Sequence, residues 1–275
     1  MIYVSDLDGT LLNSEGKLTD YTIENIKMLM SKGVKFTIAS ARSIFTATDF
    51  IEKLGLSIPI VLRNGAFIYD PVNKKILMQK FLTQKQIQPI LEFFIDEGLN
   101  PIVHHKIDEK LYVDYTRIDN YGEKQYISSR LEAGDRRFRK VDGYSYDSAS
   151  KFIAMCVIGQ NNIQEVVFKK VEKLFPKGYI IHKYVDTYSN HTWIEINHPE
   201  ATKKNAIDYI LDYLGETEYT AFGDNINDLS MLENAVAAYI PESSYLAKAG
   251  YSYEKTSSID RDGVVNKLLK LNSNI

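Results

Sequence analysis

The chain has 275 residues, a formal net charge of -3 and a hydrophobic fraction of 44%. These values are typical of a globular protein whose length suits one large domain or two smaller ones. No block of basic residues is long enough to indicate a nucleic-acid-binding surface, and no stretch approaches the ~18 apolar residues of a membrane span.

The single cysteine and the N-terminus bear on the cellular compartment. Cys156 lies in an apolar run and has no second cysteine with which to form an internal disulfide. Asp6 and Asp8 interrupt the first apolar residues, so the N-terminus does not look like a secretory signal. We therefore expect a reducing compartment and predict a cytoplasmic protein.

The first part of the chain alternates between strand and helix patterns. Strands are predicted at 2–5, 34–39 and 58–62, and helices at 19–32 and 44–54. Asn64-Gly65 is a typical hairpin turn, with a return strand at 66–69. Strands that alternate with helices predict a doubly wound parallel sheet.

The middle of the chain has a different pattern. Thr83 and Gln86 form a capping box before a helix that Gly98 ends. Strands are predicted at 101–104, 111–115, 152–158, 180–185 and 193–196, with a helix at 163–174 and a polar, poorly periodic stretch at 117–150. We predict that residues 81–191 form an inserted α+β unit, and that 1–80 plus 192–275 form the unit around it.

From Thr202 the alternation of the first part resumes. Thr202 caps a predicted helix that Gly215 ends. Further strands at 217–222 and 235–240 and helices at 228–233 and 264–271 complete the outer unit.

An acidic pair follows the first predicted strand, in Asp6-Leu7-Asp8-Gly9-Thr10. Side chains two residues apart point the same way from an extended chain. Two carboxylates held together are costly unless a cation neutralises them, and oxygen ligands suit Mg²⁺. Taken alone, the pair is equally consistent with an acidic turn.

Two further polar residues stand near the ends of predicted strands or the start of a helix. Ser40 can donate its hydroxyl to a phosphate oxygen or cap the next helix. Lys203 lies in the first turn of a helix, where a cation is unfavourable unless an anion sits opposite. The adjacent Lys204 competes for this role, and both could simply be solvated.

A second acidic group, Gly223-Asp224-Asn225-Ile226-Asn227-Asp228, also follows an apolar strand. Because ligands bind at the carboxyl ends of strands in open α/β sheets, Asp224 could complete a magnesium site with Asp6 and Asp8. A calcium-binding EF-hand is the alternative, but the acidic spacing and the missing glutamate do not fit it.

Together these motifs resemble those of the haloacid dehalogenase superfamily of phosphohydrolases, and within it the Cof-type branch with a large α/β (type IIB) cap. Residues 6–12 match the first motif, and Gly223-Asp224 with Asn227-Asp228 match the fourth. Ser40-Ala41-Arg42 and residues 201–206 resemble the second and third motifs.

The resemblance extends to smaller features and also has departures. Asn64-Gly65-Ala66 and Asp262-Gly263-Val264 are typical of the Cof-type branch. Ala41 and Lys204 stand where relatives usually have glycine, and residues 237–242 replace a loop that usually contains glycine and asparagine.

The resemblance implies a Rossmann-like core with an inserted cap, and a Mg²⁺-dependent phosphatase that works through an aspartyl-phosphate intermediate. Asp6 would be the nucleophile and Asp8 the general acid and base. The implied metal ligands are Asp6, Asp224 and the backbone carbonyl of Asp8, with Asp228 supporting them from just outside. The implied phosphate- and substrate-binding residues are Leu7 through its backbone, Ser40, Ala41, Arg42, Asn64, Lys203 rather than Lys204, and Asn227.

The expected substrate is a small phosphorylated metabolite, with a sugar phosphate as the leading candidate. The inserted unit would close over the site as a lid that sets substrate specificity. We expect no nucleic-acid, membrane or obligate protein partner. A phosphosugar mutase of similar fold and a non-catalytic phosphometabolite-binding protein are the alternatives. Asp8 argues against the second, because a mere phosphoacceptor needs no acid/base group there.

Overall fold

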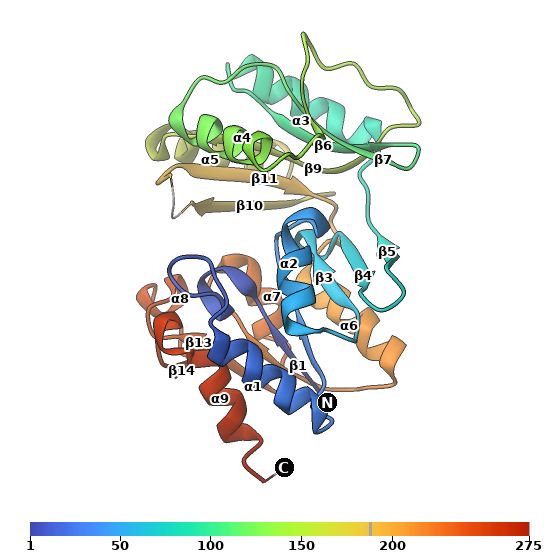
Figure 1. Ribbon diagram of the computed structural model, residues 1–275. Coiled ribbons are helices and arrows are strands. Elements are labelled where there is room, and N and C mark those ends of the chain that lie inside the picture. Colours follow the sequence, from blue (N-terminus) through green and yellow to red (C-terminus); the bar gives the residue numbers. More distant parts are fainter. Residues whose placement is uncertain (187–188, 275) are drawn as a thin grey trace. The chain divides into compact units, whose positions relative to one another are not determined.

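The structure, a computed structural model, describes residues 1–186 and 189–274. It divides into two compact units. The core unit consists of Met1–Gln79 and Ala201–Ile275, and the inserted unit consists of Lys80–Glu200. In Figure 1 the chain enters the inserted unit once and leaves it once.

The core unit is built on a parallel sheet with the strand order β14-β13-β12-β1-β2. Its strands are β1 (Ile2–Ser5), β2 (Phe36–Ile38), β12 (Tyr219–Phe222), β13 (Ala237–Pro241) and β14 (Glu254–Thr256). A second, antiparallel sheet contains β3 (Ile60–Leu62), β4 (Phe67–Asp70) and β5 (Lys75–Gln79). The strand order reverses beside β1, which is where doubly wound sheets bind their ligands.

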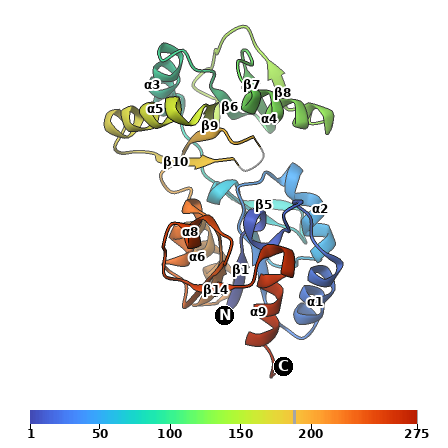
Figure 2. The ribbon, with the colours of Figure 1, turned by 90° about the vertical axis from the view of Figure 1, so that its left-hand side faces the viewer.

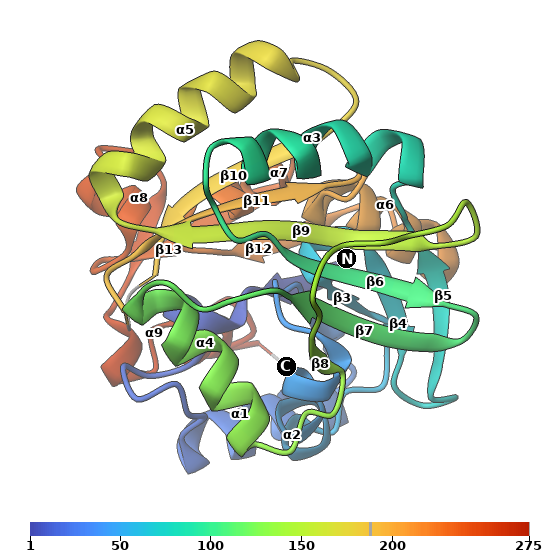
Figure 3. The same ribbon diagram turned by 90° about the horizontal axis from the view of Figure 1, so that it is seen from above.

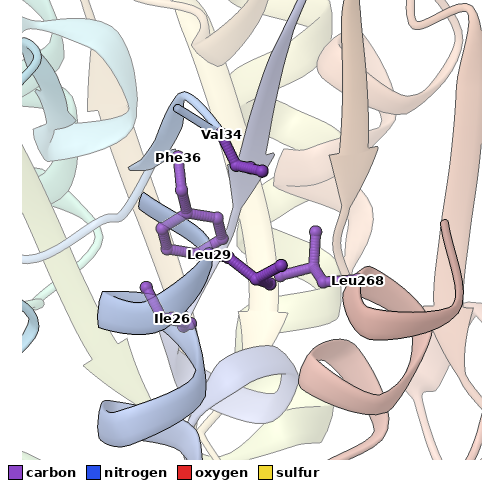
Figure 4. A pocket seen from close by; sticks show the side chains of 5 residues that line it. All are labelled: Ile26, Leu29, Val34, Phe36 and Leu268. Carbon is purple, nitrogen blue, oxygen red and sulfur yellow. The ribbon is translucent and has the colours of Figure 1, made fainter. Parts of the chain in front are cut away.

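Helices cover both faces of the parallel sheet, and Figure 2 shows β1 between α6 and α1. The helices are α1 (Asp20–Ser31), α2 (Ile44–Leu54), α6 (Lys203–Leu214), α7 (Leu229–Leu232), α8 (Tyr245–Lys248) and α9 (Gly263–Leu271). Ile2 and Val4 of β1 pack in one apolar cluster with Ile207 of α6. Phe36 of β2 and Leu268 of α9 line a small apolar pocket with residues of α1 (Figure 4). The doubly wound α/β core predicted from the sequence is confirmed.

Local signals explain where these helices begin and end. The hydroxyls of Thr19 and Thr202 accept hydrogen bonds from backbone N–H groups in the first turns of α1 and α6. Gly55 and Gly215 end α2 and α6 in the left-handed conformation. Because both kinds of signal can be read from the sequence, these helix bounds lie close to the predicted ones.

The inserted unit has one sheet with the strand order β10-β11-β9-β6-β7-β8. Its elements are α3 (Gln84–Asp96), β6 (Ile102–Ile107), β7 (Lys110–Tyr115), α4 (Tyr121–Glu132), β8 (Phe138–Lys140), β9 (Lys151–Gly159), α5 (Asn161–Leu174), β10 (Ile180–Val185) and β11 (Thr192–Asn197). Figure 3 shows α3 and α5 running along this sheet. Val103 and Met155 pack with these two helices, whereas the adjacent Ile102 and Cys156 pack with α4. Successive strand residues thus divide between two apolar clusters.

The second boundary of the inserted unit was predicted wrongly. It lies at Glu200 rather than at residue 191, because β11 pairs along one edge with β10 and along the other with β9. The strand–helix alternation of the core resumes only with α6. Residues 187–188, which belong to the predicted 81–191 unit, lie outside the described residues.

The two ends of the inserted unit lie side by side. The ammonium group of Lys80 donates a hydrogen bond to the carboxylate of Glu200, so an ion pair joins the first and last residues of the unit.

Within the described parts of the chain, no helix combines the length and the apolarity that a membrane crossing requires.

Candidate active site

The predicted site residues follow neighbouring strands at one edge of the core sheet. The N–H of Asp6 donates to the carbonyl oxygen of Phe222, at the end of β12, over 2.9 Å. The N–H of Ala39 donates to the carbonyl oxygen of Ser5, at the end of β1, also over 2.9 Å. These bonds bring the residues that follow β1, β2 and β12 to the same edge.

Three carboxylates gather at this edge. Oxygens of Asp6, Asp224 and Asp228 all lie within 4.8 Å of one another. Asp6 is 5% exposed and Asp228 is fully buried. Burial raises the pKa of Asp6 to about 7, and the negative charges of Asp228 and Asp8 act in the same direction against the opposing charge of Lys203. Burial, together with Asp228 and Asp6, also raises the pKa of Asp224 well above its usual range.

Lys203, the first residue of α6, provides a positive charge within this carboxylate cluster. Its side chain is fully buried, and its Nζ donates to Asp6 Oδ1 over 2.6 Å and to Asp228 Oδ1 over 2.5 Å. Burial by itself lowers the pKa of Lys203, but Asp228 and Asp6 more than offset it, so this pKa lies above the ordinary value. The rival Lys204 instead pairs with Asp208 one turn further along α6.

Asp228 uses both of its oxygens to hold neighbouring groups. Oδ1 accepts from Lys203, while Oδ2 accepts from the backbone N–H groups of Asp224 (2.8 Å) and Asn225 (3.0 Å). A Cβ on Gly223 would lie 2.6 Å from the Cβ of Asp228, so glycine is required for this tight loop. Asp228 therefore shapes the loop that presents Asp224.

The turn after β1 also fits closely around Asp224. Gly9 has a φ of +77°, and a Cβ there would lie 2.5 Å from Asp224 Oδ2. Thr10 Oγ1 donates to Asp224 Oδ1 over 3.2 Å. Thr10 was not among the predicted site residues, although its hydroxyl within the first motif was a visible signal.

The side chain of Asp8 lies outside the three-carboxylate group and pairs with Arg42. Arg42 Nε donates to Asp8 Oδ2 over 2.7 Å, and Arg42 Nη2 donates to Asp8 Oδ1 over 2.6 Å. Arg42 was predicted to bind phosphate or substrate, but in this structure its guanidinium group contacts a carboxylate of the chain itself.

The other residues of the first two motifs lie on the same edge. Leu7 and Ser40 are fully buried, and Ser40 Oγ accepts a hydrogen bond from the N–H of Arg42 over 3.2 Å. Ala41 is exposed, and its φ is not positive. Alanine is therefore accommodated where relatives usually have glycine.

Two asparagines from different loops contact each other. Asn227 Nδ2 donates to Asn64 Oδ1 over 3.0 Å. Asn64 has a φ of +54°, and a Cβ on the next residue, Gly65, would lie 2.1 Å from the carbonyl oxygen of Thr202. The tight turn at Arg63–Gly65, which joins β3 to β4 as predicted, therefore fits against the residue that precedes Lys203.

The unusual segment at 237–242 contains a regular strand, β13, beside β12. Tyr239 of this strand stacks on Phe222, with ring centroids 5.3 Å apart, and its carbonyl oxygen accepts from the N–H of Gly223 over 3.2 Å. The segment thus supports the start of the fourth motif.

The chain is similar to known proteins over nearly all of its length. A family model for haloacid dehalogenase-like hydrolases matches residues 3–268. A Buchnera aphidicola (subsp. Baizongia pistaciae) protein with the name "Putative phosphatase" is 30% identical over 257 residues, 90% of this chain and 88% of its own. The Bacillus subtilis protein "5-amino-6-(5-phospho-D-ribitylamino)uracil phosphatase YitU" is 24% identical over 96% of this chain and 94% of its own.

A solved structure shows the same fold. It is the structure of the "HAD Subclass IIB Sugar Phosphatase BT4131". The match has a TM-score of 0.76 at 22% identity and covers 100% of this chain and 99% of that protein's chain. The family match, the sequence relatives and the motifs at the sheet edge agree. This chain is therefore an enzyme of the haloacid dehalogenase-like hydrolase family.

Proposed function

We propose that this enzyme is a magnesium-dependent phosphatase that releases phosphate from a small phosphorylated metabolite. The observation that carries the proposal is the group formed by the buried Asp6, Asp228 and Lys203 with the partly buried Asp224, at the carboxyl ends of parallel strands. This group combines a carboxylate nucleophile, oxygen ligands for a hard cation and a fixed positive charge for phosphoryl oxygens.

The chemistry of the donor set fits Mg²⁺. The gathered ligand atoms are all oxygens. Burial, together with the neighbouring carboxylates, raises the pKa of Asp6 and of Asp224, as expected of carboxylates whose charges lack full compensation. We propose that the carboxylates of Asp6 and Asp224 and the backbone carbonyl of Asp8 hold the ion, with Asp228 as the supporting residue. When bound, Mg²⁺ would supply positive charge to the carboxylates and to the phosphoryl group.

The proposed reaction has two halves. In the first, an oxygen of Asp6 attacks phosphorus, the bond between phosphorus and the ester oxygen breaks, and Asp8 gives a proton to that oxygen. In the second, water attacks the phosphorus of the aspartyl phosphate while Asp8 takes up a proton from the water. The bond to Asp6 then breaks and inorganic phosphate leaves. Lys203, Ser40, Asn227 and the backbone N–H groups after Asp6 would bind the phosphoryl oxygens.

We propose a phosphorylated sugar or sugar alcohol as the substrate class. The two named activities among the similar proteins support it, one being a sugar phosphatase and the other acting on a phosphorylated ribityl compound. A screen of phosphorylated metabolites in Mg²⁺, with release of inorganic phosphate as the readout, tests this assignment. An isomeric sugar phosphate in place of inorganic phosphate would instead identify a mutase.

Removal of the metal should stop turnover of para-nitrophenyl phosphate, and added Mg²⁺ should restore it. Asp224→Ala should raise the Mg²⁺ concentration for half-maximal activity by at least about 10-fold, because it removes a ligand. Calorimetric titration with Mg²⁺ gives the same comparison without catalysis. The exposed Asp212→Ala on α6 is the matched control. Full activity in EDTA would contradict the metal requirement.

We propose that the inserted unit is a cap that reads the leaving group. All four motifs lie outside Lys80–Glu200, and their side chains are committed to the proposed phosphate and metal chemistry. Joining Gln79 to Ala201 by a short linker should therefore reduce kcat/KM for the true substrate on the order of 100-fold more than for para-nitrophenyl phosphate. Circular dichroism establishes that the shortened chain folds. Unchanged selectivity in a folded deletion would refute the cap's role.

A further inference from the structure

We propose that Arg42 is a positioning residue for Asp8, not a phosphate-binding residue. It would hold the carboxylate in place and give up one of its two hydrogen bonds when Asp8 meets the leaving oxygen of the substrate. This inference rests on the proposed phosphatase function, in which Asp8 is the general acid and base.

The contact between the two side chains is bidentate. Nε and Nη2 of Arg42 reach the two different oxygens of Asp8, over 2.7 Å and 2.6 Å. Two parallel hydrogen bonds fix both the direction and the plane of a carboxylate, whereas a single ammonium contact fixes little more than a distance. The Asp8 side chain is 42% exposed, so packing against its surroundings restrains it only in part.

Arg42 is itself held from several sides. Its Nη1 donates to the carbonyl oxygen of Thr46 over 3.3 Å, and its Cζ lies 4.8 Å from the centre of the Phe50 ring. Its backbone N–H donates to Ser40 Oγ over 3.2 Å, and its carbonyl oxygen accepts from the N–H of Arg63 over 3.1 Å. A side chain fixed in this way can orient a mobile partner at a small further cost in entropy.

This geometry separates the two roles that Arg42 could have. A phosphate bound by Arg42 would have to displace Asp8 from the guanidinium group. A positioning role leaves Asp8 in contact, since one oxygen can turn to the leaving oxygen while the other stays bound to Arg42. Loss of a phosphate-binding residue would slow the hydrolysis of every phosphate monoester by a similar factor. Loss of a residue that positions Asp8 would slow most the hydrolysis of esters whose leaving oxygen needs a proton.

The test compares two esters with Arg42→Lys in the full-length enzyme with Mg²⁺. Nitrophenolate is a good leaving group that needs little protonation, whereas the alkoxide that leaves glycerol phosphate must receive a proton. We expect kcat/KM for glycerol phosphate to fall by about 100-fold, and kcat/KM for para-nitrophenyl phosphate to fall by less than about 10-fold. The inhibition constant of inorganic phosphate should change by less than about 3-fold, because phosphate binding does not use Arg42.

A burst of nitrophenolate gives a second readout. Hydrolysis of the aspartyl phosphate uses Asp8 as the base, so this step should become rate-limiting in Arg42→Lys and the burst should approach one equivalent per enzyme. Phe50→Leu removes a support of Arg42 without touching Asp8. It should lower kcat/KM for glycerol phosphate more than kcat/KM for para-nitrophenyl phosphate, as Arg42→Lys does, but by a smaller factor. The exposed Arg261→Lys is the control and should change none of them.

An equal loss for both esters, with the inhibition constant of phosphate rising in parallel, would overturn the proposal and make Arg42 a phosphate-binding residue. Unchanged kinetics would also overturn it. Thermal unfolding shows whether Arg42→Lys folds, and Phe50→Leu provides the same comparison if it does not. If the wild-type enzyme releases phosphate from neither ester, the proposed phosphatase function is wrong. This result differs from those that would overturn only the positioning role of Arg42.

Discussion

Asp6→Asn should abolish phosphatase turnover while the chain still folds. An amide cannot form the aspartyl phosphate, and losing a covalent nucleophile typically reduces kcat by roughly 10⁴-fold or more. The substitution keeps the size of the side chain and its place after β1, where the backbone N–H bonds to Phe222. The measurement is kcat with para-nitrophenyl phosphate in Mg²⁺. A rate within about 10-fold of wild type would remove Asp6 from the role of nucleophile.

The same variant should be more stable than wild type at pH 8 in EDTA. Chiefly through burial, the pKa of Asp6 rises from 3.8 to about 7 in the folded chain. The folded protein then retains a proton that the unfolded chain has released, so stability falls as pH rises from about 4 to about 7. Asp6→Asn has no titrating group at this position. Its Tm should match wild type at pH 4 and exceed it at pH 8, and a lower Tm at pH 8 would contradict this account.

Lys203→Met should both inactivate and destabilise the enzyme. It would leave Asp6 and Asp228 buried without their cation, and breaking a buried ion pair typically costs about 3–5 kcal/mol. Urea unfolding in EDTA measures this loss. Adding Asp228→Asn to the variant should restore part of the stability, because it removes one of the uncompensated charges, but it should not restore activity.

Lys204→Met is the matched control for that experiment. Lys204 is the next residue of the same helix, and its ion pair with Asp208 is partly exposed. Exposed pairs contribute about 0–1 kcal/mol, so this variant should lose little stability and keep its activity. Similar losses in both lysine variants would show that the position of Lys203 has no special role.

The parts of the fold that the sequence predicts well are those with local signals. The bounds of α2 and the strands β1 and β10 lie where the pattern predicts them, since apolar runs and glycine stops mark them. α4 was missed because its sequence has little helical periodicity of apolar residues. A capping box formed by Asn120 and Glu123 was the overlooked sign of its start. The strands β5, β8 and β14 and the short helix α8 were also missed.

The arrangement of the site is only partly readable from the sequence. The approach of Asp6 to Asp224 follows from two acidic motifs at the ends of parallel strands, which the sequence reveals. The pairing of Arg42 with Asp8 does not follow in this way, because it depends on the rotamers of two loop side chains and on Phe50 beneath the guanidinium group. The boundary at Glu200 likewise depends on which strands β11 pairs with, and pairing is a long-range property.

The ion pair between Lys80 and Glu200 also bears on how this chain could evolve. A segment whose two ends meet can be exchanged for another with similarly spaced ends, without altering the chain on either side. Recombination at these two points would transfer the whole inserted unit in one event, while the four sequence motifs of the core unit are inherited intact. If the inserted unit reads the leaving group as proposed, a lineage could thus acquire a new substrate preference by exchange of this unit. Lys80 and Glu200 mark where chimaeras with relatives should be joined.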